Sequence, residues 1–288
     1  FLPAAMVEFG ARLEIVSAER IRDELVKLLS TADPVPGIRL LVESGLAARF
    51  LPELVDLVET QDDHGRHKDV YEHSLTVLRQ AIELEELRGE HGLDDPAAPD
   101  VVLRLAALLH DIGKPATRRF DRGKVTFHHH DVVGAKLVRK RLRALRFDND
   151  TVKRVARLVE LHLRFFGYSD QQWSDSAVRR YVRDAGEELE RLHILTRADV
   201  TTRNRRKAER LAHAYDDVER RIVELSEAEE LAAVRPELDG ERIMEILGIP
   251  PGPEVGQAYR YLLEVRLDEG PIGEDAAEER LRAWWAAR

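Results

Sequence analysis

The chain has 288 residues, which is enough for one large domain or two ordinary ones, and its formal net charge is −9. It contains no cysteine, so disulfides, thiolate metal ligands and cysteine nucleophiles are excluded, which fits a reducing compartment. The acidic balance does not favour nucleic acid, and any RNA contact must therefore come from local basic patches.

No apolar run approaches the roughly 20 residues that a membrane-spanning helix needs, so we expect a cytoplasmic protein with no membrane partner. The first ten residues, FLPAAMVEFG, begin without Met and lack the basic start of a secretory signal. We expect them to lie inside a longer chain. The sequence leaves the oligomeric state open.

Nearly every segment has the apolar spacing of a helix, and alternating runs rich in Val, Ile and Thr are almost absent, which predicts an all-α fold. We expect a helical neck over residues 1–60, a helical bundle over 61–215 and a helical tail over 216–288. In the neck, Ser17 is a plausible N-cap, and a second helix is expected from Ile38 to Arg49, ending before Pro52.

The bundle begins with a helix whose apolar face includes Val70, Val77 and Ala81, with His73 beside that face. The acidic, Pro- and Gly-rich segment 88–100 reads as a surface loop. The stretch LAALLHDIGKP follows, over residues 105–115.

This stretch places His110 and Asp111 at the end of a buried helix, where a carboxylate must be paired or must coordinate a cation. Neighbouring residues do not share a helix face. Both side chains therefore meet one ion only if the helix ends there, and Gly113-Lys114-Pro115 supplies that ending.

Downstream, Asp121-Arg122-Gly123 indicates a tight turn in a short hairpin, and three histidines, 128–130, open a helix. Another helix starts near Thr151 and carries His162; the sequence Asp148-Asn149-Asp150 before it is read as helix-cap chemistry. Ser174 or Asp175 caps the next helix, and Leu189 to Asp199 forms the one after.

The last third of the chain begins with a long, heavily charged helix from Arg203, which we expect to lie largely on the surface. In the tail, three prolines and a glycine within residues 250–253 predict a sharp joint between two short helices. That joint is read as a plain turn rather than a phosphate site.

Six side chains are candidate metal ligands, and each lies in or beside a helix with a core-facing stripe: His73, His110, Asp111, His130, His162 and Asp199. Helical bundles build metal sites in this way, from facing helices. Nitrogen and carboxylate ligands suit Mg, Mn, Ni, Co, Fe or Zn, and the set has room for one ion or two. Histidines 64, 91, 193 and 213 are read as ordinary side chains.

Lys114, Arg118 and Arg119 follow the site directly and are suited to binding the phosphate of a phosphoester substrate. We expect Asp111 and Lys114 to be the catalytic pair. Further basic runs are either solvated helix faces or RNA backbone contacts. They comprise Arg179, Arg180 and Arg183, and then Arg203, Arg205, Arg206, Lys207 and Arg210.

The succession YEH, LLHDIGKP, FHHHD with VGA, LVELH and RAD resembles the HD superfamily of metal-dependent phosphohydrolases. The resemblance implies that His73, His110, Asp111 and Asp199 are the basic ligand set. His130 and His162 match the additional histidines of members with a larger site, and the spacing to VGA favours His130 among the three histidines.

The motifs SAERIRDELVKLL, ESGLAARFLPEL and LDGERIMEILGIPPGPEVG further resemble the C-terminal part of bacterial CCA-adding tRNA nucleotidyltransferases. This resemblance implies tRNA as a partner and favours RNA contacts for the basic runs. The Gly-rich loop and paired aspartates of that family's nucleotidyl-transfer head have no match here, so CCA addition is not expected from these residues alone. Two alternatives remain open: a free-standing HD nucleotidase and a binding module with a vestigial metal site.

Overall fold

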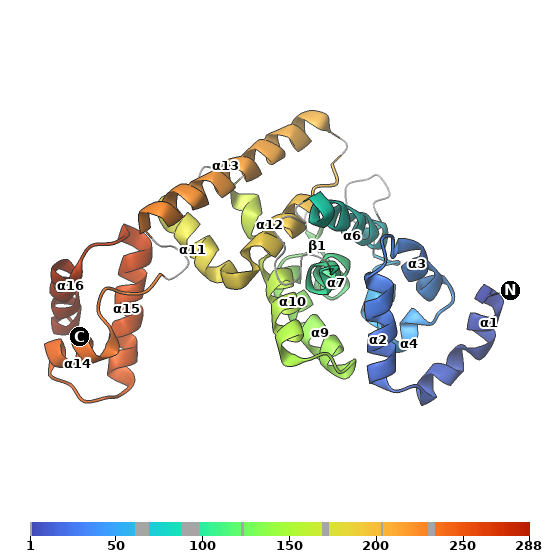
Figure 1. Cartoon of the computed structure of the whole chain (residues 1–288), viewed down its shortest axis with the longest axis horizontal. Coiled ribbons are helices and arrows are strands. Elements are labelled where there is room, and N and C mark those ends of the chain that lie inside the picture. The colour runs from blue at the N-terminus through green and yellow to red at the C-terminus, as the bar shows by residue number, and fades with distance from the viewer. Residues whose placement is uncertain are drawn as a thin grey trace. The chain divides into compact units, whose positions relative to one another are not determined.

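A computed structural model describes residues 2–60, 69–87, 98–121, 124–168, 173–202, 204–229 and 234–288. Apart from two short strands, the regular secondary structure of these residues is helical, which confirms the all-α prediction (Figure 1). The chain forms two compact units, one of residues 1–166 with 187–211 and one of residues 167–186 with 212–288. The predicted boundaries at residues 60 and 215 stay a prediction.

The first unit contains the neck and most of the bundle. Its neck elements are α1 (Leu2–Phe9), η1 (Gly10–Ile15), α2 (Ala18–Leu29), α3 (Val35–Glu43), α4 (Ala47–Phe50) and α5 (Pro52–Asp56). Its bundle elements are α6 (Val70–Leu87), α7 (Val101–Leu109), α8 (Lys114–Thr117), β1 (Arg119–Asp121), β2 (Lys124–Thr126), α9 (His130–Ala144), α10 (Asn149–Leu161), η3 (Arg164–Gly167) and α12 (Leu189–Ala198).

Two local predictions for the neck have different outcomes. The Ser17 hydroxyl accepts a hydrogen bond from the backbone N–H of Arg20, which confirms Ser17 as the N-cap of α2. The single helix expected from Ile38 to Arg49 is wrong, because α3 ends at Glu43 and α4 begins only at Ala47. Gly45 between them has φ +76°, a left-handed backbone that ends a helix at low cost only in glycine.

The bundle is built on α7, which is apolar almost all round and is buried from Leu103 to Leu109. Helices α6, α10 and α12 each pack against α7, and α9 packs along α10. Three of these helices end at the same region: α7 before His110, α10 before His162 and α12 before Asp199. Helix ends, rather than helix faces, therefore carry most of the candidate site.

The predicted hairpin is present as strands β1 and β2, which pair antiparallel with Phe120 opposite Val125. Its turn residues 122–123 lie outside the described residues. The Asp148 carboxylate accepts a hydrogen bond from the Thr151 N–H, which confirms the helix-cap reading of that acidic pair. Ser174, rather than Asp175, is the N-cap of the helix that follows in the second unit.

The second unit contains α11 (Asp175–Ala185), α14 (Gly240–Leu247), α15 (Pro253–Glu269) and α16 (Glu274–Ala286). Two further elements, η4 (Gly186–Glu188) and α13 (Arg205–Glu229), have residues in both units. Helices α14, α15 and α16 enclose a small apolar core around Ile243, Leu262 and Leu281. The proline joint lies between α14 and α15, but α15 has 17 residues, so the expectation of two short helices holds only for α14. Among the described residues, no helix is both long and apolar enough to cross a membrane.

Candidate metal centre

Four of the six candidate ligands meet where α6, α7 and α12 come together. The Nε2 atom of His73 lies 2.8 Å from Oδ1 of Asp199 and 3.7 Å from Oδ2 of Asp111. The Nε2 atom of His110 lies 3.3 Å from Nε2 of His73 and 3.2 Å from Oδ2 of Asp111. Side chains separated by up to 126 positions in the sequence are thus brought to one point.

The other two histidines adjoin the same point from α9 and α10. His130 places Nε2 3.3 Å from Oδ1 of Asp111, and the ring centroids of His130 and His162 are 5.2 Å apart. The His162 ring is also 5.3 Å from that of His110. His130 is buried, whereas His128 and His129 are exposed, so His130 is the member of the triplet that faces the cluster.

Asp111 joins the two halves of the cluster. His73, His110 and Asp111 present ligand atoms within 4.8 Å of one another, and so do Asp111, His130 and His162. Each triad has the size and the nitrogen and oxygen donors that a divalent transition metal or Mg accepts. The arrangement is therefore suited to divalent metal binding, in one position or in two that share Asp111.

Hydrogen bonds from the imidazoles fix which nitrogen faces the cluster. Three rings place Nδ1 on the backbone oxygen of the residue three positions earlier: His110 on Ala107 at 2.9 Å, His130 on Phe127 at 2.8 Å and His162 on Val159 at 2.6 Å. A carbonyl oxygen only accepts, so Nδ1 carries the proton and Nε2 faces the cluster. Nε2 is thereby oriented as a metal ligand, which is the usual role of such outer hydrogen bonds.

Two of the buried Nε2 atoms lack good hydrogen-bond partners, which favours a cation as their partner. Among the described residues, Nε2 of His162 has no hydrogen-bond partner, and Nε2 of His130 has only the imperfectly aligned approach to Asp111. A buried polar atom without a partner costs about 1–3 kcal/mol. A metal ion accepting both lone pairs removes that cost.

The charges of the cluster are set by burial and by the two carboxylates. Burial opposes a charge on His110, but Asp111 and Asp199 outweigh it and raise its pKa to about 9. Burial lowers the pKa of His162 to about 4. Despite burial, the hydrogen bond from His73 lowers the pKa of Asp199 to about 2, and the neighbouring cations hold the pKa of Asp111 well below its usual range. Both carboxylates are therefore ionised at neutral pH, as metal binding requires, whereas a bound ion would have to displace the Nε2 proton of His110.

The expected phosphate-binding residues begin beside the cluster. The Lys114 ammonium lies 2.8 Å from Oδ2 of Asp111 and 5.6 Å from the centre of the Phe127 ring. Arg118 and Arg119 are exposed at the start of the hairpin, outside the cluster itself. Lys114 is thus the one expected cation that touches a candidate ligand.

The basic runs predicted for RNA differ in exposure. Arg179 is buried, with its guanidinium bound to the Glu229 carboxylate at 2.7 and 2.8 Å, so it holds the second unit together rather than facing solvent. Arg180 pairs with Asp268 and Glu264, and Arg183 lies 3.9 Å from Glu264. Arg205, Arg206, Lys207 and Arg210 are exposed on α13, and Arg203 lies outside the described residues.

Sequence reasoning missed one supporting residue and treated the other histidines as ordinary. Thr201 places its hydroxyl 3.2 Å from Nδ1 of His73 and so orients that ligand. The signal for it was its position two residues after Asp199. His193 is buried outside the cluster, His213 is exposed, and histidines 64 and 91 lie outside the described residues.

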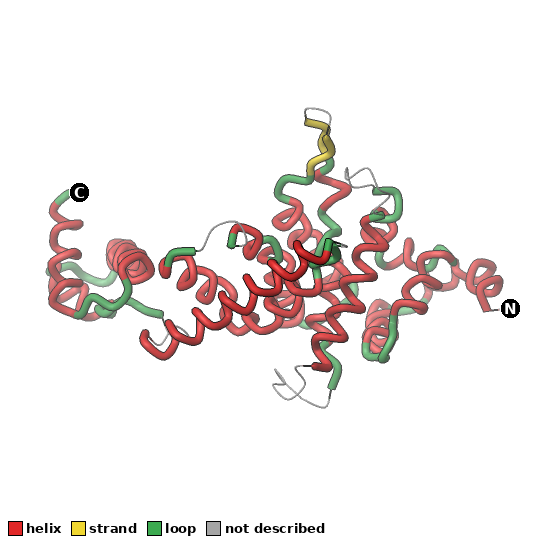
Figure 2. Tube along the Cα trace, turned by 90° about the horizontal axis from the view of Figure 1, so that it is seen from above, coloured by secondary structure: helices red, strands yellow, loops and turns green. Residues whose placement is uncertain are grey.

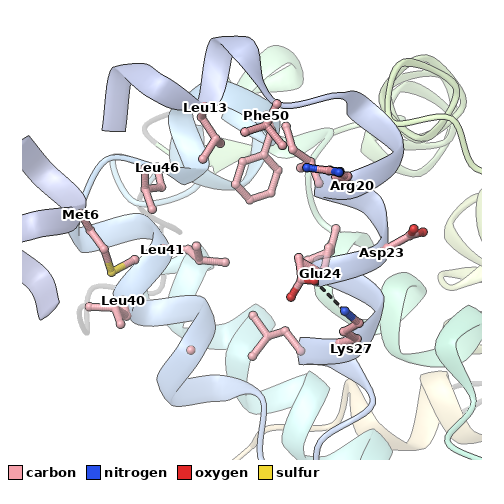
Figure 3. A pocket seen from close by; sticks show the side chains of 15 residues that line it. Met6, Leu13, Arg20, Asp23, Glu24, Lys27, Leu40, Leu41, Leu46 and Phe50 are labelled. Atoms are coloured by element: carbon pink, nitrogen blue, oxygen red, sulfur yellow. Dashed lines mark hydrogen bonds and ion pairs between the residues drawn. The ribbon is translucent and has the colours of Figure 1, made fainter. Parts of the chain in front are cut away.

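The neck contains a cavity of about 700 Å³ between α1, α2, α3 and α4. Figure 3 shows Met6, Leu40, Leu41 and Leu46 lining it, with charged groups only along α2, where Lys27 and Glu24 are paired. Such a lining suits apolar groups and offers no cluster of cations for a phosphate.

Comparison with known proteins finds two family matches within the chain. Residues 70–204 match the HD domain family, and residues 3–57 match the probable RNA and SrmB-binding site of polymerase A. The chain is 36% identical to an A-adding tRNA nucleotidyltransferase of Deinococcus radiodurans, over 96% of this chain and 60% of that protein. It is 35% identical to a CC-adding tRNA nucleotidyltransferase of Thermus thermophilus, over 93% of this chain and 56% of that protein.

A multifunctional CCA protein of Alkalilimnicola ehrlichii is 35% identical over 51% of the chain and 33% of its own length. The chain thus spans about 60% or less of the length of these relatives. By these matches, it carries an HD domain and is homologous to the C-terminal part of CCA- and A-adding tRNA nucleotidyltransferases.

Proposed function

We propose that this chain is the tRNA-binding and metal-dependent phosphohydrolase portion of a CCA-type tRNA nucleotidyltransferase. The observation that carries the proposal is the meeting of four imidazole Nε2 atoms and two ionised carboxylates at one buried point. His73, His110, Asp111 and Asp199 are the proposed principal ligands, with His130 and His162 completing a larger site.

The proposed reaction is hydrolysis of a phosphomonoester or of a cyclic or 2′-phosphate. A divalent cation held by these residues supplies Lewis acidity and lowers the pKa of a bound water to about 7. Asp111 is the only ligand common to both triads, so it is placed to contact an ion in either of them. Lys114, 2.8 Å from Asp111, is placed to neutralise charge that builds on the phosphate oxygens during attack.

The proposed partner is tRNA, with proposed contacts on the neck and on α13. The match of residues 3–57 to an RNA-binding family supports the neck as one contact. The exposed cations Arg205, Arg206 and Lys207 on α13 are proposed as phosphate contacts, and Arg179 is left out because its guanidinium is buried against Glu229. Such binding weakens steeply as salt rises, since it depends on released counterions.

The test combines metal content with turnover in the protein and in the double variant His110→Ala with Asp111→Ala. The expected result is bound divalent metal and hydrolysis of a phosphoester panel by the parent protein, and loss of both in the variant. Circular dichroism controls for folding. Activity that is unchanged in the folded double variant refutes the catalytic assignment.

The same measurements separate the two alternatives. Binding of tRNA that falls between 50 and 200 mM salt argues against a free-standing nucleotidase acting on small nucleotides. Full metal occupancy without turnover across the phosphoester panel argues for a binding module with a vestigial site.

A further inference from the structure

The β1–β2 hairpin is an extension of the metal centre. Asp111 and Lys114 precede it, and the residue that follows β2, Phe127, accepts the hydrogen bond from Nδ1 of His130. The Lys114 ammonium and the Phe127 ring face each other at 5.6 Å. Both ends of the hairpin are therefore anchored to candidate ligands, and Figure 2 shows its two strands projecting from the helices.

The projecting strands present an aromatic side chain that the fold does not bury. Phe120 is 74% exposed, and the Arg118 guanidinium lies 5.1 Å from the centre of its ring. An exposed phenylalanine on a two-stranded ribbon gains nothing for folding, because hydrophobic stabilisation requires area removed from water. The pair instead offers a flat aromatic surface with a planar cation beside it.

The charge around Phe120 favours a negatively charged ligand. Arg118, Arg119 and Lys124 are exposed on the hairpin, against the single carboxylate of Asp121, which is opposite Lys124 in the strand register. Aromatic and guanidinium planes flanked by cations are the features with which proteins hold unstacked nucleobases of single-stranded nucleic acid.

We infer that Phe120 and Arg118 form a stacking surface for the nucleobase of a phosphoester bound at the metal centre. The inference rests on the proposed function and narrows its substrate class to nucleotides, whether free or at the unpaired end of an RNA. The hairpin holds the base while Lys114 and the metal centre hold the phosphate.

The main test compares adenosine 3′-monophosphate, a short single-stranded RNA ending in a 3′-phosphate, and ribose 5-phosphate, which has no base. Stacking of one base corresponds to about a 5- to 150-fold effect. Phe120→Ala and Phe120→Leu are expected to lower kcat/KM by that factor for the two base-bearing substrates, mainly through KM, and to leave ribose 5-phosphate unchanged. Phe120→Tyr, which keeps an aromatic face, is expected to restore turnover.

Leu87→Ala is the matched control. Leu87 is 81% exposed at the C-terminal end of α6, so this substitution also removes an exposed apolar side chain. The control is expected to leave kcat/KM unchanged for all three substrates. If the effect is confined to the RNA, the base belongs to an RNA end; if it extends to the mononucleotide, a free nucleotide suffices. An unchanged ratio of nucleotide to ribose 5-phosphate turnover in Phe120→Ala overturns the inference while leaving the proposed hydrolysis intact.

A second measurement decides the question even if the parent protein hydrolyses none of these compounds and the proposed function fails. Phe120→Trp places a fluorophore on the hairpin, and the signal of the three native tryptophans is subtracted with the parent protein. Adenosine 3′-monophosphate is expected to quench the added fluorescence, and ribose 5-phosphate is not. Equal response to both compounds, or to neither, overturns the inference.

Discussion

Gly113 is the position where one added methyl group tests the geometry of the centre. A Cβ built there meets the backbone oxygen of His130 at 2.1 Å and the backbone nitrogen of Gly134 at 2.6 Å. The residue has φ −79°, an ordinary backbone, so the obstacle is the close approach of α9 and not conformational strain. Gly113→Ala must therefore push the first turn of α9 away from α7.

The size of that displacement follows from the contact distances. Relieving the 2.1 Å contact to the 3.0 Å below which real Cβ contacts are essentially never seen requires a shift of about 0.9 Å. Overpacking of this kind costs about 1–3 kcal/mol, which corresponds to a fall in Tm of about 2–12 °C for a unit of this size. A misplacement near 1 Å also reduces catalysis by about 10²-fold.

The assays are thermal unfolding, bound metal and phosphoester turnover. Gly256→Ala is the control, because its Cβ meets only Arg260 Nη1 at 3.6 Å inside α15. That substitution is expected to stabilise its helix by about 0.5–1 kcal/mol. If Gly113→Ala keeps the parent Tm and metal content, the close packing of α9 on the metal centre is wrong.

Four further predictions concern a buried ion pair, its pH dependence, a helix cap and metal binding. Glu229→Gln leaves the buried Arg179 without its carboxylate, removes one of the two carboxylates beside the buried Arg266, and is expected to cost about 3–5 kcal/mol in urea unfolding. Arg220→Gln is the control, because Arg220 pairs with Asp217 and Glu224 at the surface, and it is expected to leave the unfolding midpoint nearly unchanged. The hydrogen bond from Arg179, despite burial, holds the pKa of Glu229 below its ordinary 4.5. The contribution of Glu229 to the free energy of unfolding is therefore complete above pH 4.5 and is lost as the pH falls through the lower folded pKa. A free energy of unfolding that stays constant from pH 7 to 3 contradicts this prediction. Asp148→Ala removes the N-cap of α10 and is expected to cost about 0.5–2 kcal/mol, whereas Asp148→Asn, which keeps a capping oxygen, is expected to cost less. Removal of metal by a chelator is expected to lower the Tm of metal-loaded protein. The loss is equivalent to about 2.7 kcal/mol if the metal was present at 100 times its Kd. Calorimetry that detects no change in Tm argues against a metal site in the folded state.

Local features of the fold were predictable because their causes are local. Ser17 and Asp148 cap helices through hydrogen bonds to residues three positions ahead, and apolar spacing indicates helices without knowledge of their partners. The break between α3 and α4 was missed because the apolar period continues across Gly45, where only the backbone conformation changes. Helix α1 lies in the predicted helical neck, but no separate helix was assigned to its residues.

Features that depend on distant partners were less accessible. The burial of Arg179 follows from Glu229, 50 residues away, and no period in the sequence connects the two. The six candidate ligands could be named because each has a chemically distinctive side chain at a helix end or beside a core-facing stripe. Their distances, and the position of Asp111 in both triads, required the packing of α6, α7, α9, α10 and α12.

The bonds from Nδ1 to a carbonyl three residues earlier have a consequence for how such a centre tolerates change. His110, His130 and His162 each take their ring direction from their own short stretch of backbone, not from a neighbouring helix. Surrounding side chains can therefore be exchanged without turning the imidazoles, as long as the three backbone stretches keep their places. A designer who wished to transplant this centre would need to reproduce these three short peptide conformations and their relative positions, together with the segments that supply His73 and Asp199.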